Sequence, residues 1–130
     1  MKWIAVTGAA IVGWLSVLPA SAQTEPRLKS GWLNSQDYPR AAVRRHAQGV
    51  LVLGFTVDTD GRATDCQTLQ STGDALLDDQ GCRIWTSRMR YEPARDAADE
   101  PVAANLQQQI VWTLGDVRRC PATVICISPY

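Results

Sequence analysis

Residues Gly49–Gly73, GVLVLGFTVDTDGRATDCQTLQSTG, decide the fold of this 130-residue chain. Apolar and small or polar side chains alternate from Leu51 to Asp58, and this period of two is typical of a strand with one buried face. The turn Asp58–Gly61 can close a hairpin, because glycine adopts the positive φ that a short loop needs. The return strand, Ala63–Gln70, is more polar. We therefore predict one β-hairpin around which the rest of the domain is arranged.

The N-terminus has the features of a secretory signal peptide. Lys2 precedes an apolar run from Trp3 to Leu18, and Ala20-Ser21-Ala22 is a small-residue cleavage signature. We predict that residues 1–22 are removed before Gln23 and that the chain is exported. The alternative is an uncleaved membrane anchor, although the apolar run is shorter than the roughly 20 residues that a spanning helix prefers.

The charge balance argues against nucleic acid as a partner. Thirteen basic residues face 13 acidic ones, whereas binding to phosphates requires a clustered basic surface. The length leaves room for one domain.

The four cysteines, Cys66, Cys82, Cys120 and Cys126, fit an oxidising compartment, where an even number predicts disulfides. Three pairings are possible. Cys66 with Cys82 and Cys120 with Cys126 is the most economical, because each bridge then joins neighbouring elements. Zinc is the alternative, but the chain has no Cys-x-x-Cys pair and a single histidine. We predict disulfides, no metal and no cofactor.

Two helices and a third long strand complete the predicted fold. Asp37-Tyr38-Pro39 opens a helix that reaches about Ala47, with Asp37 as a capping candidate. A second helix begins at Leu76-Leu77-Asp78, and its apolar stripe is formed by Cys82, Trp85 and Met89. Alternation over Val102–Leu114 predicts a half-buried strand. The expected fold class is α+β, a small two-layer domain with an antiparallel sheet of about three strands packed with two α-helices.

The predicted organisation along the chain has four parts. After the signal peptide, residues 23–37 form a short mobile leader, and residues 38–114 form the domain. Residues 115–130 form an irregular tail tied by a disulfide.

The sequence offers no catalytic constellation, and we predict that the protein is not an enzyme. A nucleophile–base arrangement would depend on His46, which lies on an arginine-rich helix with no evident orienting acid. The aspartates of the hairpin do not form a calcium loop, because Leu69 stands where a bidentate Glu is required. No glycine-rich phosphate loop follows a predicted strand.

An ordered set of motifs resembles the C-terminal domain family of TonB, the periplasmic end of the energy transducer for outer-membrane transporters. The set covers most of the chain after the signal peptide. The matching residues are Tyr38-Pro39, Gly49, Phe55-x-Val57-Asp58-x-Asp60-Gly61, Ser71-Thr72-Gly73, Leu77-Asp78 and Arg88-Met89-Arg90-Tyr91-Glu92-Pro93-Ala94.

The resemblance implies a periplasmic domain that binds an extended peptide, the TonB box of a transporter or a similar segment of another envelope protein, by adding a strand to its sheet. Such binding would link the protein to TonB-dependent transport. Carried over by position, the flank of the site is Tyr38 and Pro39. The edge strand is Val102, Ala103, Ala104, Asn105, Leu106, Gln107, Gln108, Gln109 and Ile110.

Two departures from the family keep other functions open. Only Gln23–Asp37 separate the signal from the domain, and at about 3.3–3.6 Å per residue they span at most roughly 50 Å. Cys66 and Cys82 also replace positions that are usually apolar in the family. One alternative is therefore a short transducer anchored in the inner membrane by an uncleaved helix. Another is a structural protein of the envelope that self-associates, for example as a homodimer joined edge to edge.

Overall fold

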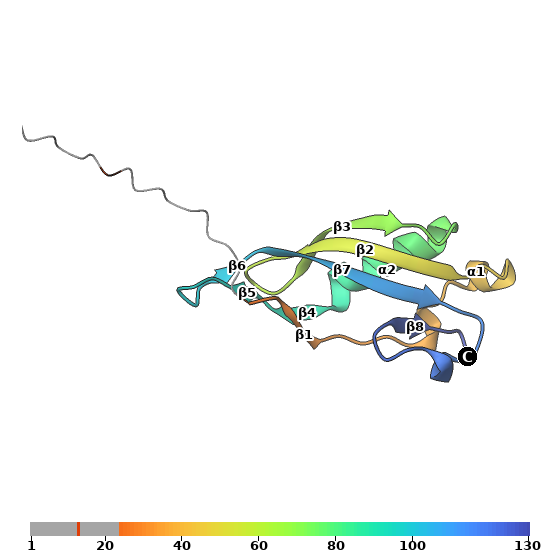
Figure 1. Cartoon of the computed structure of the whole chain (residues 1–130). Coiled ribbons are helices and arrows are strands. Elements are labelled where there is room, and N and C mark those ends of the chain that lie inside the picture. The colour runs from red at the N-terminus through yellow and green to blue at the C-terminus, as the bar shows by residue number, and fades with distance from the viewer. Residues whose placement is uncertain (1–12, 14–23) are drawn as a thin grey trace, which may run out of the picture.

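The computed structural model describes residue 13 and residues 24–130. The predicted signal peptide and its cleavage point therefore lie outside the described residues, apart from Gly13. The element order is shown in Figure 1. The elements are β1 (Arg27–Ser30), η1 (Ser35–Asp37), α1 (Arg40–Arg44), β2 (Gly49–Val57), β3 (Ala63–Gln70), α2 (Ala75–Arg88), β4 (Arg90–Glu92), β5 (Ala94–Arg95), β6 (Pro101–Val102), β7 (Ala104–Trp112), η2 (Val117–Arg119) and β8 (Ile125–Ile127), where η marks a 3₁₀ helix.

The main sheet has four strands in the order β3-β2-β7-β8. Strand β2 lies between β3 and β7 and is antiparallel to both, whereas β8 is parallel to β7. Two small ribbons, β1–β4 and β5–β6, complete the strand pairing. The fold class is α+β, and the sheet is mixed rather than purely antiparallel because of β8.

The central hairpin is confirmed. Strand β2 buries every second side chain from Leu51 to Val57. The turn is closed by Asp58, whose backbone N–H donates to the Arg62 carbonyl at 2.9 Å, and Gly61 has a φ of 83°. A side chain at Gly61 would also collide with the Tyr91 carbonyl oxygen, 2.1 Å from an ideal Cβ. This turn therefore requires glycine for both its backbone conformation and its close contact with β4.

Helix α2 forms the main cover of the sheet, as Figure 1 shows. Its buried residues are Leu77, Gly81, Ile84 and Trp85. A Cβ at Gly81 would lie 2.3 Å from Leu51 Cδ2, so the glycine permits close packing of the helix on β2. The predicted stripe is confirmed at Trp85 and at Met89, the buried C-cap residue, but it omitted Leu77 and Ile84.

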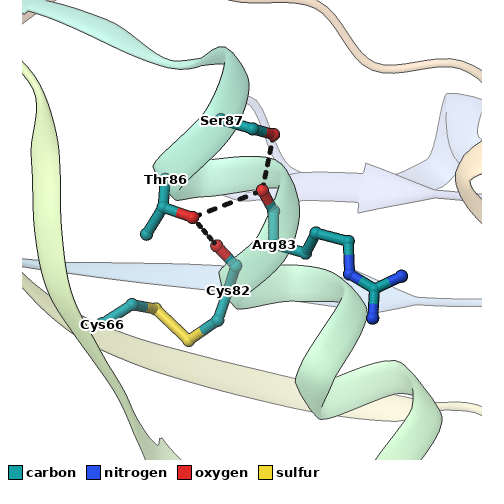
Figure 2. Close-up of a disulfide and its surroundings, with 5 residues drawn as sticks. All are labelled: Cys66, Cys82, Arg83, Thr86 and Ser87. Carbon is teal, nitrogen blue, oxygen red and sulfur yellow. Dashed lines mark hydrogen bonds between the residues drawn. A yellow bond between two sulfur atoms is a disulfide. The ribbon is translucent and has the colours of Figure 1, made fainter.

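The disulfide between Cys66 and Cys82 joins β3 to α2, with a Cα–Cα distance of 5.7 Å. Figure 2 shows it beside the last turns of the helix. There the hydroxyl of Thr86 donates to the Cys82 carbonyl at 2.9 Å, and that of Ser87 donates to the Arg83 carbonyl at 2.6 Å. The second disulfide joins Cys120 and Cys126. Both bridges follow the economical pairing.

The first predicted helix is shorter than expected and has a different cap. Helix α1 has Pro39 as its N-cap, with no side-chain hydrogen bond. Asp37 belongs instead to η1, where it forms a capping box with Asn34. Its buried carboxylate accepts hydrogen bonds from the Asn34 N–H at 2.8 Å and from Arg88 Nη1 at 2.6 Å. Asp37 is therefore held by its partner on α2.

The predicted mobile leader is ordered from Thr24 onward. Strand β1 pairs with β4, and Thr24 forms an isolated bridge with Arg95. The Arg88 guanidinium carbon lies 3.8 Å from the centre of the Trp32 ring, a cation–π contact. The leader was predicted to be mobile because its polar sequence has no period, and its order comes from pairing with a strand about 60 residues away in the sequence.

Candidate functional site at the edge of the sheet

Strand β7 has two halves with different neighbours. On one side it pairs with β2 along its whole length, from Ala104 to Trp112. On the other side, its pairing with β8 covers only Ile110–Trp112. Among the described residues, no strand pairs with the outer side of Ala104–Gln109. We call these six residues the open edge.

The backbone groups of the open edge can be assigned to its two sides. The Thr113 N–H donates to the Ile127 carbonyl at 3.0 Å, so it points toward β8 and away from β2. Because successive N–H and C=O groups of a strand point to alternate sides, those of Asn105, Gln107 and Gln109 share this outward direction. The N–H of Leu106 points toward β2.

One outward carbonyl already has a partner from its own strand. The side-chain amide of Gln108 donates to the Gln109 carbonyl at 2.9 Å. Gln108 interrupts the apolar face of β7, and this contact explains the polar residue there. The Gln109 carbonyl lies where the pairing with β8 begins, since Ile110 is opposite Ile125.

The exposed face of the sheet is hollowed beside the open edge. A cavity of about 320 Å³ is lined by Gly54, Gln67, Leu69 and Gln107, among others. It lies where Gly54 leaves the face without a side chain, and Leu69 partly covers this position. On the rim, the Thr56 hydroxyl donates to Asn105 Oδ1 at 2.8 Å. The hollow has a mixed polar and apolar lining that could accept a side chain.

Only part of the predicted edge strand lies on the open edge. Val102 lies in β6, where it pairs with Ala94, and Ala103 lies between β6 and β7. Ile110 is opposite Ile125 of β8, so its outer side is occupied. The residues that remain available for strand addition are Ala104, Asn105, Leu106, Gln107, Gln108 and Gln109.

The predicted flank packs against the covered half of β7. Tyr38 is 2% exposed, and its ring meets that of Trp112 edge-on with the centroids 5.2 Å apart. Its hydroxyl donates to the Ala47 carbonyl. Burial, together with the nearby Asp74 carboxylate and Tyr130, raises the pKa of Tyr38 above its usual value. Tyr38 is a core residue, and Pro39 beside it caps α1.

The tail was predicted to be irregular, and this prediction is wrong for residues 117–119 and 125–127, which form η2 and β8. A signal for the strand is present in Val124–Ile127, VICI, a short run of β-branched and apolar residues. The run is short and contains a disulfide cysteine, so its sequence alone is equally typical of a loop tied by a disulfide.

The described residues contain no cluster of His, Cys, Asp and Glu arranged to hold a metal ion. Among the helices of the same part of the chain, none has the length and apolar character needed to cross a membrane.

Three comparisons relate the chain to known proteins. Residues 34–114 match the family described as Gram-negative bacterial TonB protein C-terminal. Protein TonB of Pseudomonas aeruginosa is 33% identical over 85 residues, which cover 58% of this chain and 25% of that protein. The solution NMR structure of the Pseudomonas aeruginosa TonB C-terminal domain superposes with a TM-score of 0.54 at 24% identity, covering 68% of this chain and 85% of the other.

The chain therefore belongs to the TonB C-terminal domain family. Domains of this family are non-enzymatic and periplasmic, and the two disulfides are consistent with an oxidising compartment. The matched segment represents a quarter of the length of the Pseudomonas protein. The match ends at residue 114, before η2 and β8.

Proposed function

We propose that this domain binds extended peptide segments in the periplasm by adding them as a strand to the open edge of β7. The proposed partners are TonB-box-like segments of outer-membrane transporters or of other envelope proteins, which would connect the domain to TonB-dependent transport. The observation that carries the proposal is the six-residue stretch Ala104–Gln109, which is held by β2 on one side and has no strand partner on the other among the described residues.

Strand addition fits the chemistry of this stretch. Six residues at about 3.3 Å each give an edge roughly 20 Å long, enough for a short peptide to form several backbone hydrogen bonds. The outward N–H and C=O groups supply affinity for any extended chain. The hollow over Gly54 supplies a place where a side chain of the peptide can be distinguished.

The direct test is titration of the isotope-labelled protein with peptides from the N-terminal plug regions of outer-membrane transporters of the same organism. Gln107→Pro removes an outward N–H, and a proline is tolerated on an edge strand when that N–H faces away from the sheet. We expect peptide affinity to fall at least about tenfold, since one backbone donor and the local strand geometry are lost. Gln107→Ala is the matched control, because it retains the N–H.

Leu106→Pro sharpens the same test from the other side of the strand. Its N–H points toward β2, so proline there removes a hydrogen bond within the sheet and should destabilise the fold itself. The proposal would be wrong if Gln107→Pro left both the fold and the affinity unchanged. It would also be wrong if chemical shifts on binding were concentrated on β3 rather than on Ala104–Gln109.

Two other functions predict different results. A homodimer joined edge to edge uses the same backbone groups, and sedimentation at several protein concentrations would reveal it. In that case Gln107→Pro would weaken the dimer while no peptide shifted any resonance. A membrane-anchored transducer requires that residues 1–22 are retained, and the mass of the protein recovered from cells distinguishes a chain that begins at Gln23.

A further inference from the structure

We propose that the C-terminal tail is a disulfide-held stop that limits strand addition to the open edge. In this arrangement β8 occupies the outer side of β7 from Ile110 onward, so a bound peptide must end at Gln109. Releasing the tail would extend the available edge to Thr113. This inference rests on the proposed function, because it concerns the length and register of the same site.

Strand β8 and an added strand would use the same backbone groups of β7. Ile125, Cys126 and Ile127 are opposite Ile110, Val111 and Trp112 in a parallel register. The Thr113 N–H, which has the same outward direction as that of Gln107, donates to the Ile127 carbonyl. The tail therefore forms with β7 the type of contact that is proposed for the peptide, and the two cannot occupy Ile110–Trp112 together.

The end of the tail is held in place by burial. Ile127 is 3% exposed and belongs to the hydrophobic core, in which Trp112 also packs. Ser128 is likewise buried. Leu33 from the segment after β1 lines the same small cavity as Ile127 and Ser128. These contacts fix β8 against the sheet and against the N-terminal part of the chain.

The rest of the tail has little to hold it except the disulfide. Residues 115–123 are exposed, apart from the half-buried Cys120. A strand of three residues is too short to be stable by its pairing alone. The Cys120–Cys126 bridge, with a Cα–Cα distance of 6.4 Å, closes this loop, and Cys126 is itself the middle residue of β8. The bridge thus restricts the movements that would carry β8 away from β7.

The tail also lies outside the matched segment of the chain. The family match ends at residue 114, and the bridge between Cys66 and Cys82 ties the sheet to α2 independently of the tail. A role for the tail at the edge is therefore separable from the folding of the sheet.

The experiment compares two peptides on two forms of the full exported protein. The peptides are a six-residue and a ten-residue version of the transporter plug peptide that binds best. In the unmodified protein we expect the two to bind with equal affinity, because the longer one has no further edge to pair with. In Cys120→Ser/Cys126→Ser the longer peptide should bind at least about tenfold more tightly than the shorter, with new shifts at Val111 and Thr113.

Two further variants make the comparison decisive. A chain that ends at Gly115 lacks the tail and should show the same preference for the longer peptide, provided that its resonances remain dispersed as in a folded protein. Cys66→Ser/Cys82→Ser removes the disulfide that joins β3 to α2 and should keep the two affinities equal. A preference for the longer peptide in this control would show that loosening of the domain, rather than release of the tail, is the cause.

The possible outcomes separate the two proposals. One outcome is that peptides shift the Gln107 resonance in every form while the ten-residue peptide binds no more tightly than the six-residue one in either tail variant. In that case the proposed stop is wrong and strand addition stands. If β8 remains paired with β7 in Cys120→Ser/Cys126→Ser, the proposed role of the Cys120–Cys126 disulfide is wrong. If no peptide shifts the open edge in any form, strand addition fails, and the inference about its limit fails with it.

Discussion

The two halves of β7 share one partner strand but differ in burial and in pairing. In the covered half, Ile110 and Trp112 are buried and both sides of the strand are paired. In the open half, Asn105, Gln107 and Gln109 expose their side chains, and only the side toward β2 is paired. The difference shows how one strand can provide stability at one end and leave backbone groups for recognition at the other.

The covered half of β7 also lies at the end of the sheet where β2 and α2 are linked through the turn at Thr72. Gly49 pairs with Trp112, and a Cβ at Gly49 would lie 2.9 Å from the Thr72 carbonyl oxygen. The carboxylate of Asp78 accepts from the N–H and hydroxyl of Thr72 at 3.0 and 2.8 Å, which connects this turn to α2. We therefore expect stability to be concentrated at this end of the sheet.

The largest expected effect is at Trp112. Trp112→Ala removes a large buried side chain that packs against Tyr38, and it should cost about 3–5 kcal/mol of unfolding free energy. Gln107→Ala in the open half should change it by less than about 0.5 kcal/mol. Urea unfolding measures both. Similar losses for the two variants would contradict the division of the strand into a stabilising half and a recognition half.

The two disulfides are expected to differ in how much they stabilise the fold. Cys66→Ala/Cys82→Ala opens a loop with a sequence separation of 16 and should cost about 3 kcal/mol in the chain-entropy model. Cys120→Ala/Cys126→Ala opens one with a separation of 6 and should cost about 2 kcal/mol. Thermal unfolding should therefore rank the first variant as the less stable. The reverse order would mean that the tail contributes more to the fold than its exposed loop indicates.

A smaller effect is expected at Asp74, the N-cap of α2. Its side chain accepts from the N–H groups of Leu76 and Leu77 and from the guanidinium of Arg45. Asp74→Ala should cost about 1 kcal/mol at neutral pH, the usual value for loss of a cap. Urea unfolding at pH 7 gives this difference.

The pH dependence of the same residue has a definite sign. The hydrogen bond from Arg45, with those from the helix N–H groups, lowers the pKa of Asp74 below its ordinary value of 3.8. Stability from this carboxylate is therefore complete above that value and is lost as the pH falls through the lower folded pKa. The difference between the unmodified protein and Asp74→Ala should shrink below about pH 4. A difference that persists at pH 2 would argue against a charged cap.

Regular alternation made the longer strands of the sheet predictable. Leu51 to Val57 and the even-numbered residues of β7 follow a period of two, and this pattern depends only on which face of the strand is buried. The turn at Asp58–Gly61 was predictable from its own residues, because glycine adopts the positive φ that a short loop needs. Helix α2 was predictable for a similar reason, since its apolar residues recur with the helical period.

The missed features are contacts between residues that are distant in sequence. Strands β1 and β8 are four and three residues long, too short to carry a period, and each exists because a partner strand accepts it. Asp37 caps η1 together with Asn34 instead of α1, and its carboxylate also accepts from Arg88, which is distant in sequence. The predicted edge strand overlaps β7 over Ala104–Ile110, while the end of the open edge at Gln109 depends on β8 and could not be inferred from β7 alone.

The smallest expected effect concerns the side chain that covers the open edge. Gln108→Ala removes the amide that donates to the Gln109 carbonyl, and stability should change by less than about 0.5 kcal/mol because the site is half-exposed. Peptide affinity should also remain within about twofold, because the Gln109 carbonyl lies where β8 begins to pair with β7 and an added strand need not displace this hydrogen bond. Calorimetric titration measures the change.

Gln109→Ala is the matched control for this variant, because it keeps both the Gln109 carbonyl and the Gln108 amide. Its peptide affinity should remain within about twofold of the unmodified protein. If Gln108→Ala lowered the affinity while the control did not, the amide of Gln108 would be a contact for the peptide rather than a cover for the edge. The open half of β7 would then recognise its partner through side chains as well as through its backbone.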